Sequence, residues 1–100
     1  MSRPDSAAVT NNIPSQQFEL ATPAGKAVLG YIPRDGALDL VHTRVPDPVE
    51  GQGFGTALVQ AAIAAARRDG VKIIPTCPFV QHYVDAHPDL ASLVGPRVQS

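Results

Sequence analysis

The chain has 100 residues, of which 44% are hydrophobic and 17% charged, and its formal net charge is −1. This length suits one small domain, and the near-zero charge without a charged block argues against nucleic acid or an anionic membrane as the main partner. No apolar run reaches the roughly 18 residues of a transmembrane helix, so none is expected.

The N-terminal stretch predicts little structure. Residues 1–16 are polar and without periodicity, so we expect a flexible tail, followed by a single compact domain over residues 17–96. The stretch also lacks the apolar segment of a signal peptide. Cys77 is the only cysteine, which fits a reducing cytoplasm because no intramolecular disulfide can form.

Three antiparallel strands are predicted next. The apolar runs at 18–22, 27–33 and 38–45 are separated by turn-forming residues at 23–25 and by Asp35-Gly36, a strong hairpin signal. Strict alternation would divide the third run into two faces. One face would carry Leu38, Leu40, His42 and Arg44, and the other Asp39, Val41, Thr43 and Val45.

The periodicity then changes to that of a helix from about Gly53 to Asp69, ended by Gly70. Its predicted buried stripe consists of Leu58, Ala61, Ala62 and Ala65. Residues 71–77 predict a fourth main strand, in which Pro75 indicates an edge or an opening. A short helix is expected over 78–87, and a further helical turn or a tail over 88–94.

Three alternating glycines, Gly51, Gly53 and Gly55, stand directly before the long helix. Glycines let a ligand approach the backbone, and a helix start offers free N–H groups, so the segment predicts a phosphate site. The donors would be the amides of Gln52, Gly53, Phe54, Gly55 and Thr56. The alternative is a loop needed only for tight packing between strand and helix.

Two common phosphate loops do not fit this segment. No lysine precedes Thr56, which argues against a Walker A loop. Thr56 also stands where the dinucleotide fingerprint needs its last glycine, and the preceding strands look antiparallel, so the start of a parallel β–α–β unit is not expected.

Three blocks together resemble a known family. "HTRVP" at 42–46, "EGQGFGT" at 50–56 and "PTCPFV" at 75–80 occur in order, followed by Tyr83 and His87-Pro88. They resemble a compact subfamily of the GCN5-related N-acetyltransferases, over roughly residues 17–94. The resemblance implies an α/β (α+β) fold with a mostly antiparallel twisted sheet flanked by helices, lacking the usual helices between its first strands.

The resemblance also implies acetyl-CoA as cosubstrate, without a metal, and transfer of its acetyl group to an unidentified amine by direct attack on the thioester. The pyrophosphate would lie on the glycine loop at 51–56. The pantetheine arm would lie between the splayed third strand and the Cys77 strand, along Thr43, Arg44 and Val45.

Three side chains are candidates for catalysis, each with a structural alternative. His42 could serve as the base because its ordinary pKa lies near neutrality, or it could simply be bonded to a neighbour. Tyr83 could protonate the leaving thiolate, or it could be a core aromatic residue. Cys77 could take the acetyl group, lie beside the thioester without reacting, or be a buried small hydrophobic residue.

Two residues depart from the family pattern. Glu50 stands where the superfamily has Gln or Arg, and Arg44 stands where the subfamily is expected to have an acid. They favour the alternative of a non-catalytic CoA- or acyl-CoA-binding module. The direct hairpin at 34–37 leaves no helix to wall the acceptor site. We therefore expect that site to receive a protein or peptide amine, or to be completed by the second subunit of a homodimer.

Overall fold

Five strands form one mixed sheet, and the structure, a computed structural model, describes residues 4–95. The strands are ordered β1-β2-β3-β4-β5 across the sheet. Their bounds are β1 (Thr10–Asn12), β2 (Gln17–Thr22), β3 (Gly25–Arg34), β4 (Ala37–Arg44) and β5 (Lys72–Pro75). The α-helices are α1 (Phe54–Asp69) and α2 (Pro78–Asp85), and the 3-10 turns are η1 (Ser6–Ala8), η2 (Asp47–Val49) and η3 (Pro88–Leu90).

The sheet contains one parallel pair of strands, at the end of an otherwise antiparallel order. Neighbouring strands from β1 to β4 are antiparallel, whereas β4 and β5 are parallel, with α1 as the crossover between them. The expectation that the helix lacks a parallel β–α–β unit is therefore wrong. The residue pattern of one strand does not show whether its partner is antiparallel or parallel. Helix α1 spans about 24 Å at 1.5 Å per residue, and so carries the chain back to the start of β4, where β5 can begin parallel to it. The predicted fold class, a mostly antiparallel sheet with flanking helices, is confirmed.

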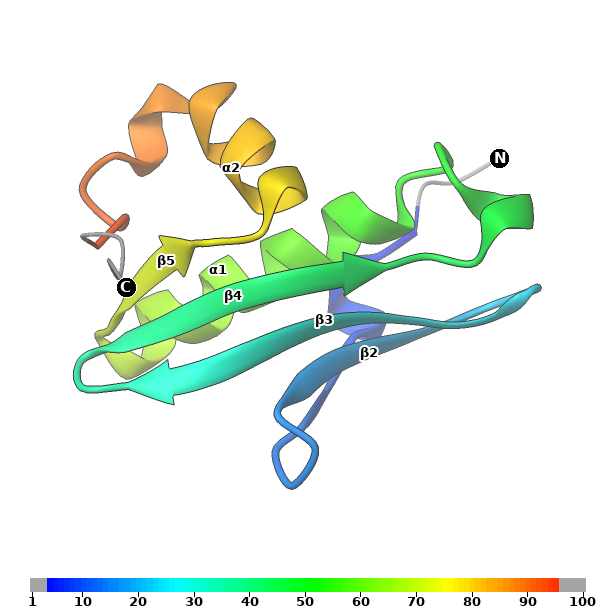
Figure 1. Cartoon of the computed structure of the whole chain (residues 1–100), viewed down its shortest axis with the longest axis horizontal. Coiled ribbons are helices and arrows are strands. Elements are labelled where there is room, and N and C mark those ends of the chain that lie inside the picture. Colours follow the sequence, from blue (N-terminus) through cyan, green and yellow to red (C-terminus); the bar gives the residue numbers. More distant parts are fainter. Residues whose placement is uncertain (1–3, 96–100) are drawn as a thin grey trace.

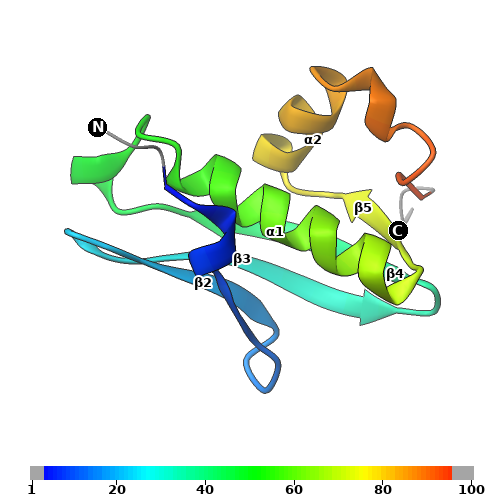
Figure 2. The same cartoon turned by 180° about the vertical axis from the view of Figure 1, so that it is seen from behind.

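Helix α1 lies across one face of the sheet and buries its apolar stripe there (Figures 1 and 2). Of the predicted stripe, Leu58, Ala62 and Ala65 are buried, and Ala61 is half-buried. The sheet contributes Phe18, Leu20, Ala27, Leu29, Tyr31 and Leu40 to the same core. Alternate residues of the strands thus face α1, and the residues between them form the sheet's other face, called the outer face below.

The segment before Gln17 differs from the flexible tail that the sequence predicts. Residues 10–12 form β1 and pair with β2, and the Tyr31 hydroxyl donates a hydrogen bond to the Asn11 side-chain oxygen at 2.7 Å. The polar residues of β1 carry no alternating apolar pattern, so no strand signal was present in the sequence. An edge strand exposed to water needs none, because its backbone bonds to β2 and the Tyr31 contact hold it.

The turns and helix ends follow the sequence signals. Gly36 adopts a φ of +72° in the hairpin between β3 and β4, and Gly70 ends α1 at a φ of +69°. Pro75 is the last residue of β5 and pairs with Leu40, as expected for a proline beside an opening. Within residues 4–95, no helix has the length and apolar character that crossing a membrane requires.

Candidate functional site

Strands β4 and β5 diverge halfway along β4. Their parallel pairing runs from Ala37 with Lys72 to Leu40 with Pro75. The chain then turns into α2. The last backbone hydrogen bond to β4 is donated by the Cys77 amide to the Leu40 carbonyl, at 2.8 Å. From Val41 onward, this edge of β4 has no strand partner among the described residues. A ligand with amide groups can therefore pair with the backbone along it.

A β-bulge at Val41 changes which side chains face α1. Gly30 pairs with His42 and Tyr31 pairs with Leu40, so Val41 is an extra residue in β4. Directly paired residues share a face of the sheet. His42 therefore lies on the outer face, although Leu40 faces the core. The prediction that Leu40 and His42 share one face is wrong, because a bulge inserts one residue and resets the alternation.

The same bulge turns Thr43 toward the opening. Thr43 pairs with buried Leu29, so it lies on the α1 side of the sheet. Its hydroxyl lies 3.4 Å from the Cys77 sulfur. Cys77 is 4% exposed, at the N-terminus of α2. The structure thus brings Thr43 and Cys77 together at the point where β4 and β5 part.

The glycine loop forms the N-terminus of α1. Gly53 caps the helix in the left-handed region, at a φ of +96°, and its carbonyl accepts the first helical bond from Ala57 at 3.0 Å. The amides from Gly53 to Thr56 have no backbone partner among the described residues. The Gln52 amide, by contrast, donates to the Val49 carbonyl at 3.3 Å, so it is not a free donor as predicted.

A cavity of about 710 Å³ joins this loop to the free edge of β4. Its walls are Pro4, Thr43, Val45, Glu50, Gly51, Gln52, Gly53, Phe54, Gly55, Thr56, Ala57, Gln60 and Phe79. Glu50 is the only ionisable side chain among these residues, and an anion there would depend on backbone amides. Gly55 is needed for packing, because a Cβ there would lie 2.8 Å from the Phe79 ring.

Arg44 lies outside this wall. It pairs with Val28 and its exposed side chain belongs to the outer face. Of the predicted cofactor-binding residues, the cavity therefore collects Thr43, Val45 and the loop from Gln52 to Thr56, and leaves out the Arg44 side chain.

The other catalytic candidates lie apart from the cavity wall. The His42 ring lies over Gly30 on the outer face, where a Cβ on Gly30 would be 2.9 Å from its Nδ1 atom. Tyr83 packs partly against the core and stacks on His87, with ring centroids 4.1 Å apart. Neither residue lines the cavity. The sequence placed both near the thioester, but strand and helix rotation decide where they point.

Asp39, which was not among the predicted site residues, is only 2% exposed. Its carboxylate accepts hydrogen bonds from the Arg34 Nε atom at 2.8 Å and from the Thr76 hydroxyl. A charged residue within the apolar run at 37–41 was the available signal, because strands seldom bury an unpaired acid. Within residues 4–95, no three His, Cys, Asp or Glu side chains gather as a metal site would need.

Comparison with known proteins gives consistent matches. The family model of the GCN5-related N-acetyl-transferases matches residues 17–93. The proteins called NATD1 of chicken, mouse and human are each 37% identical over 51 residues, 51% of this chain and 46%, 46% and 45% of their own lengths. The chain thus spans about half the length of these curated relatives.

A solved structure shares the fold. The solution structure of a GCN5-like protein of Staphylococcus aureus superposes with a TM-score of 0.69 at 24% identity. The match covers 99% of this chain and 94% of that one. This superposition shows that the two chains share the arrangement of strands and helices.

Proposed function

Because the chain belongs to the GCN5-related N-acetyltransferase family, we propose that it transfers the acetyl group of acetyl-CoA to an amine. One observation carries the proposal. The amides from Gly53 to Thr56 have no backbone partner among the described residues, and they line a cavity that also reaches Thr43 at the opening between β4 and β5. The free loop amides, which would hold phosphate, and the open strand edge are therefore joined by one cavity.

The residues present fit the parts of acetyl-CoA in order. The loop amides at the positive end of α1 would hold the pyrophosphate. The free edge of β4 from Val41 to Val45 would pair with the amides of the pantetheine arm. The thioester would then lie near Thr43 and Cys77, whose side chains contact each other where β4 and β5 part.

His42 would serve an amine that arrives from the outer face. With the cavity side of the opening filled by the pantetheine arm, the other side is left for the acceptor. The exposed His42 imidazole lies there and could take the proton that the amine loses as it attacks the thioester carbon. The carbon–nitrogen bond forms as the carbon–sulfur bond breaks, and the thiolate leaves with a proton. The roles of Tyr83 as the donor of that proton and of Cys77 as an acetyl carrier stay predictions from the sequence.

A non-catalytic CoA- or acyl-CoA-binding module is the second candidate. Glu50 favours it, because this acidic residue belongs to the wall where pyrophosphate would bind. An acid there weakens the binding of an anion unless water screens it. The two candidates differ only in turnover, because both need the same loop and the same strand edge.

The open outer face also bears on partners. The hairpin Asp35-Gly36 joins β3 and β4 directly, so no helix between them walls an acceptor site. We propose a protein or peptide amine as acceptor, or a second copy of the chain that completes the site. Free buried Cys77 suits a cytoplasmic location, where thiols stay reduced.

Calorimetric titration with acetyl-CoA and CoA, followed by an assay of amine-dependent thiol release, tests the proposal. Binding that Gly53→Val abolishes, together with turnover on added amines, is the expected result. Binding without turnover on any amine would favour the second candidate. Failure to bind either ligand at millimolar concentration would refute both.

A further inference from the structure

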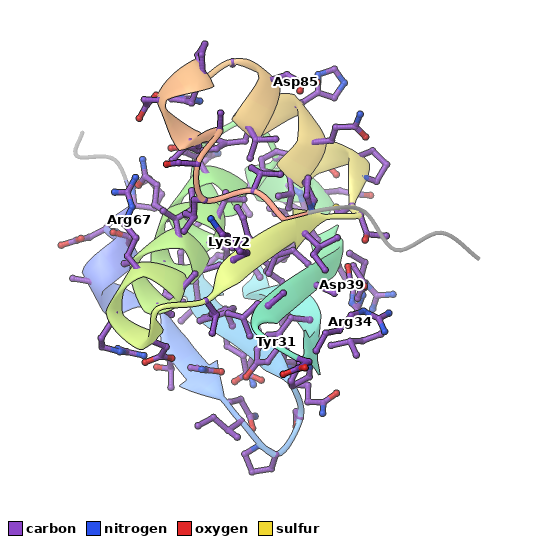
Figure 3. All side chains as sticks on the ribbon, turned by 90° about the vertical axis from the view of Figure 1, so that its left-hand side faces the viewer. Tyr31, Arg34, Asp39, Arg67, Lys72 and Asp85 are labelled. Atoms are coloured by element: carbon purple, nitrogen blue, oxygen red, sulfur yellow. The ribbon has the colours of Figure 1, made fainter. Side chains whose placement is uncertain are left out.

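Asp39 is a buried acid on the face of the sheet that α1 does not cover. Figure 3 shows Arg34 and Asp39 close together on the side of the sheet away from α1. Asp39 pairs with Ile32 on β3 and with Ile74 on β5, so it stands in the middle of three strands. At 2% exposure, the side-chain oxygens of Asp39 need hydrogen-bond partners within the protein, because leaving them unbonded would be costly.

Both carboxylate oxygens of Asp39 are engaged by different elements. The Arg34 Nε atom donates to Oδ2 at 2.8 Å from the end of β3, and the Thr76 hydroxyl donates to Oδ1. Thr76 is the first residue after β5, and Cys77 follows it directly. Through this hydrogen bond, Asp39 holds Thr76, the residue before Cys77, against β4 at the point where the two strands diverge.

A second side-chain contact joins this junction to β4 on the opposite face of the sheet. Thr43 contacts the Cys77 sulfur at 3.4 Å from the α1 side. Between the two faces, the Cys77 amide donates to the Leu40 carbonyl at 2.8 Å. The junction of β5 with α2 is thus held to β4 on both faces and through the backbone, beside Thr43 of the cavity wall.

We propose that Asp39 is a positioning residue for acetyl transfer, acting through Thr76. It fixes the width of the opening and the placement of Cys77, and so the place of the thioester between β4 and α2. This inference rests on the proposed function. Displacing reacting groups by about 1 Å can lower a rate by about 100-fold, whereas the glycine loop, which binds the distant phosphates, does not depend on this contact.

The test replaces Thr76 rather than Asp39, because Thr76 can lose its hydroxyl without a change of shape. Thr76→Val removes the donor to Asp39, and Thr76→Ser keeps it. Thr22→Val is the matched control, since the Thr22 hydroxyl donates to the Gly25 carbonyl at 2.6 Å in the distant β2–β3 hairpin. The assays are kcat and KM for acetyl-CoA, calorimetric Kd, and amide hydrogen exchange of Cys77, at a temperature where circular dichroism shows every variant folded.

We expect Thr76→Val to lower kcat by about 10- to 100-fold and to change the Kd for acetyl-CoA by less than about threefold, because the loop amides stay in place. Thr76→Ser should restore kcat, and Thr22→Val should leave it unchanged. The Cys77 amide should exchange at least about tenfold faster in Thr76→Val, since its bond to Leu40 would open more often. A kcat within twofold of the unaltered chain would overturn the inference.

The exchange measurement separates this inference from the proposed function. If the unaltered chain shows no turnover at all, the proposed function fails, and the positioning of Cys77 is judged by exchange alone. Faster exchange in Thr76→Val that Thr76→Ser reverses would then support the tie through Asp39. Equal exchange in all variants would overturn it.

Discussion

Replacing Gly53 with alanine tests whether the glycine loop binds phosphate or only lets strand and helix pack closely. Gly53 has a φ of +96°, which residues with a side chain rarely adopt. An alanine in the left-handed region costs about 1–2 kcal/mol, and for a domain of this size the midpoint of thermal unfolding should fall by about 4–16 °C. Crowding adds little, because the new Cβ would lie no nearer than 3.4 Å from Pro4.

Gly36→Ala is the matched control for backbone strain. Gly36 also has a positive φ, +72°, and a Cβ there would meet nothing within 4 Å. It lies in the hairpin between β3 and β4, away from the cavity wall. Both variants should therefore lose similar stability, measured by urea unfolding at equal protein concentration.

Only Gly53→Ala should weaken the binding of acetyl-CoA. Alanine draws φ toward negative values, which turns the amides that follow residue 53 away from the cavity. Loss of one hydrogen bond to a charged group corresponds to about 1.5–3 kcal/mol, or about 10- to 150-fold in Kd measured by calorimetry. Equal Kd values for Gly53→Ala and Gly36→Ala would refute the phosphate role and leave packing as the purpose of the loop.

Three further predictions concern separate residues. Gly30→Ala should destabilise the fold by about 1–3 kcal/mol, because its Cβ would lie 2.9 Å from the His42 Nδ1 atom. In a His42→Ala background, urea unfolding should show that most of this loss of stability is removed. A loss that persists in that background would disprove the contact. Glu50→Gln should tighten the binding of CoA by about two- to sixfold at low salt. Calorimetry at about 1 M salt should show that this gain in affinity vanishes. A gain in affinity that does not depend on salt would contradict an electrostatic cause. Hydrogen bonds, chiefly from the Gln17 side chain, hold the pKa of Glu19 below its usual range. The stability that these bonds contribute is therefore fully present above the usual pKa of a glutamate. It is lost as the pH falls through the lowered pKa of the folded protein. Urea midpoints between about pH 6 and pH 2.5 should therefore fall more steeply for the unaltered chain than for Glu19→Gln, and parallel curves would show that the carboxylate contributes nothing.

The order of the main elements could be predicted from the sequence because its signals are local. The Asp35-Gly36 turn, the proline-free helix and Gly70 each determine the backbone over a few residues, whatever lies around them. The glycine loop was found for the same reason. Its conformation depends on glycine, and its position depends on the helix that directly follows it.

The orientation of the candidate catalytic residues could not be predicted in this way. The extra residue at Val41 exists only in relation to β3, since a bulge is defined by what the partner strand places opposite. It sends His42 to the outer face and Thr43 to the cavity side. One residue of shift exchanges the two faces of a strand, and no alternation within β4 itself records it.

The sequence by itself therefore determined the succession of strands, helices and turns, together with the loop that offers free amides. The tertiary structure alone decided that residues 10–12 join the sheet, that β4 and β5 run parallel and then part, and that Asp39 is buried between Arg34 and Thr76. The physical reason is the range of the interactions. Turns and helix ends depend on the dihedral angles of neighbouring residues, whereas strand partners, bulges and buried ion pairs depend on groups that only folding brings together.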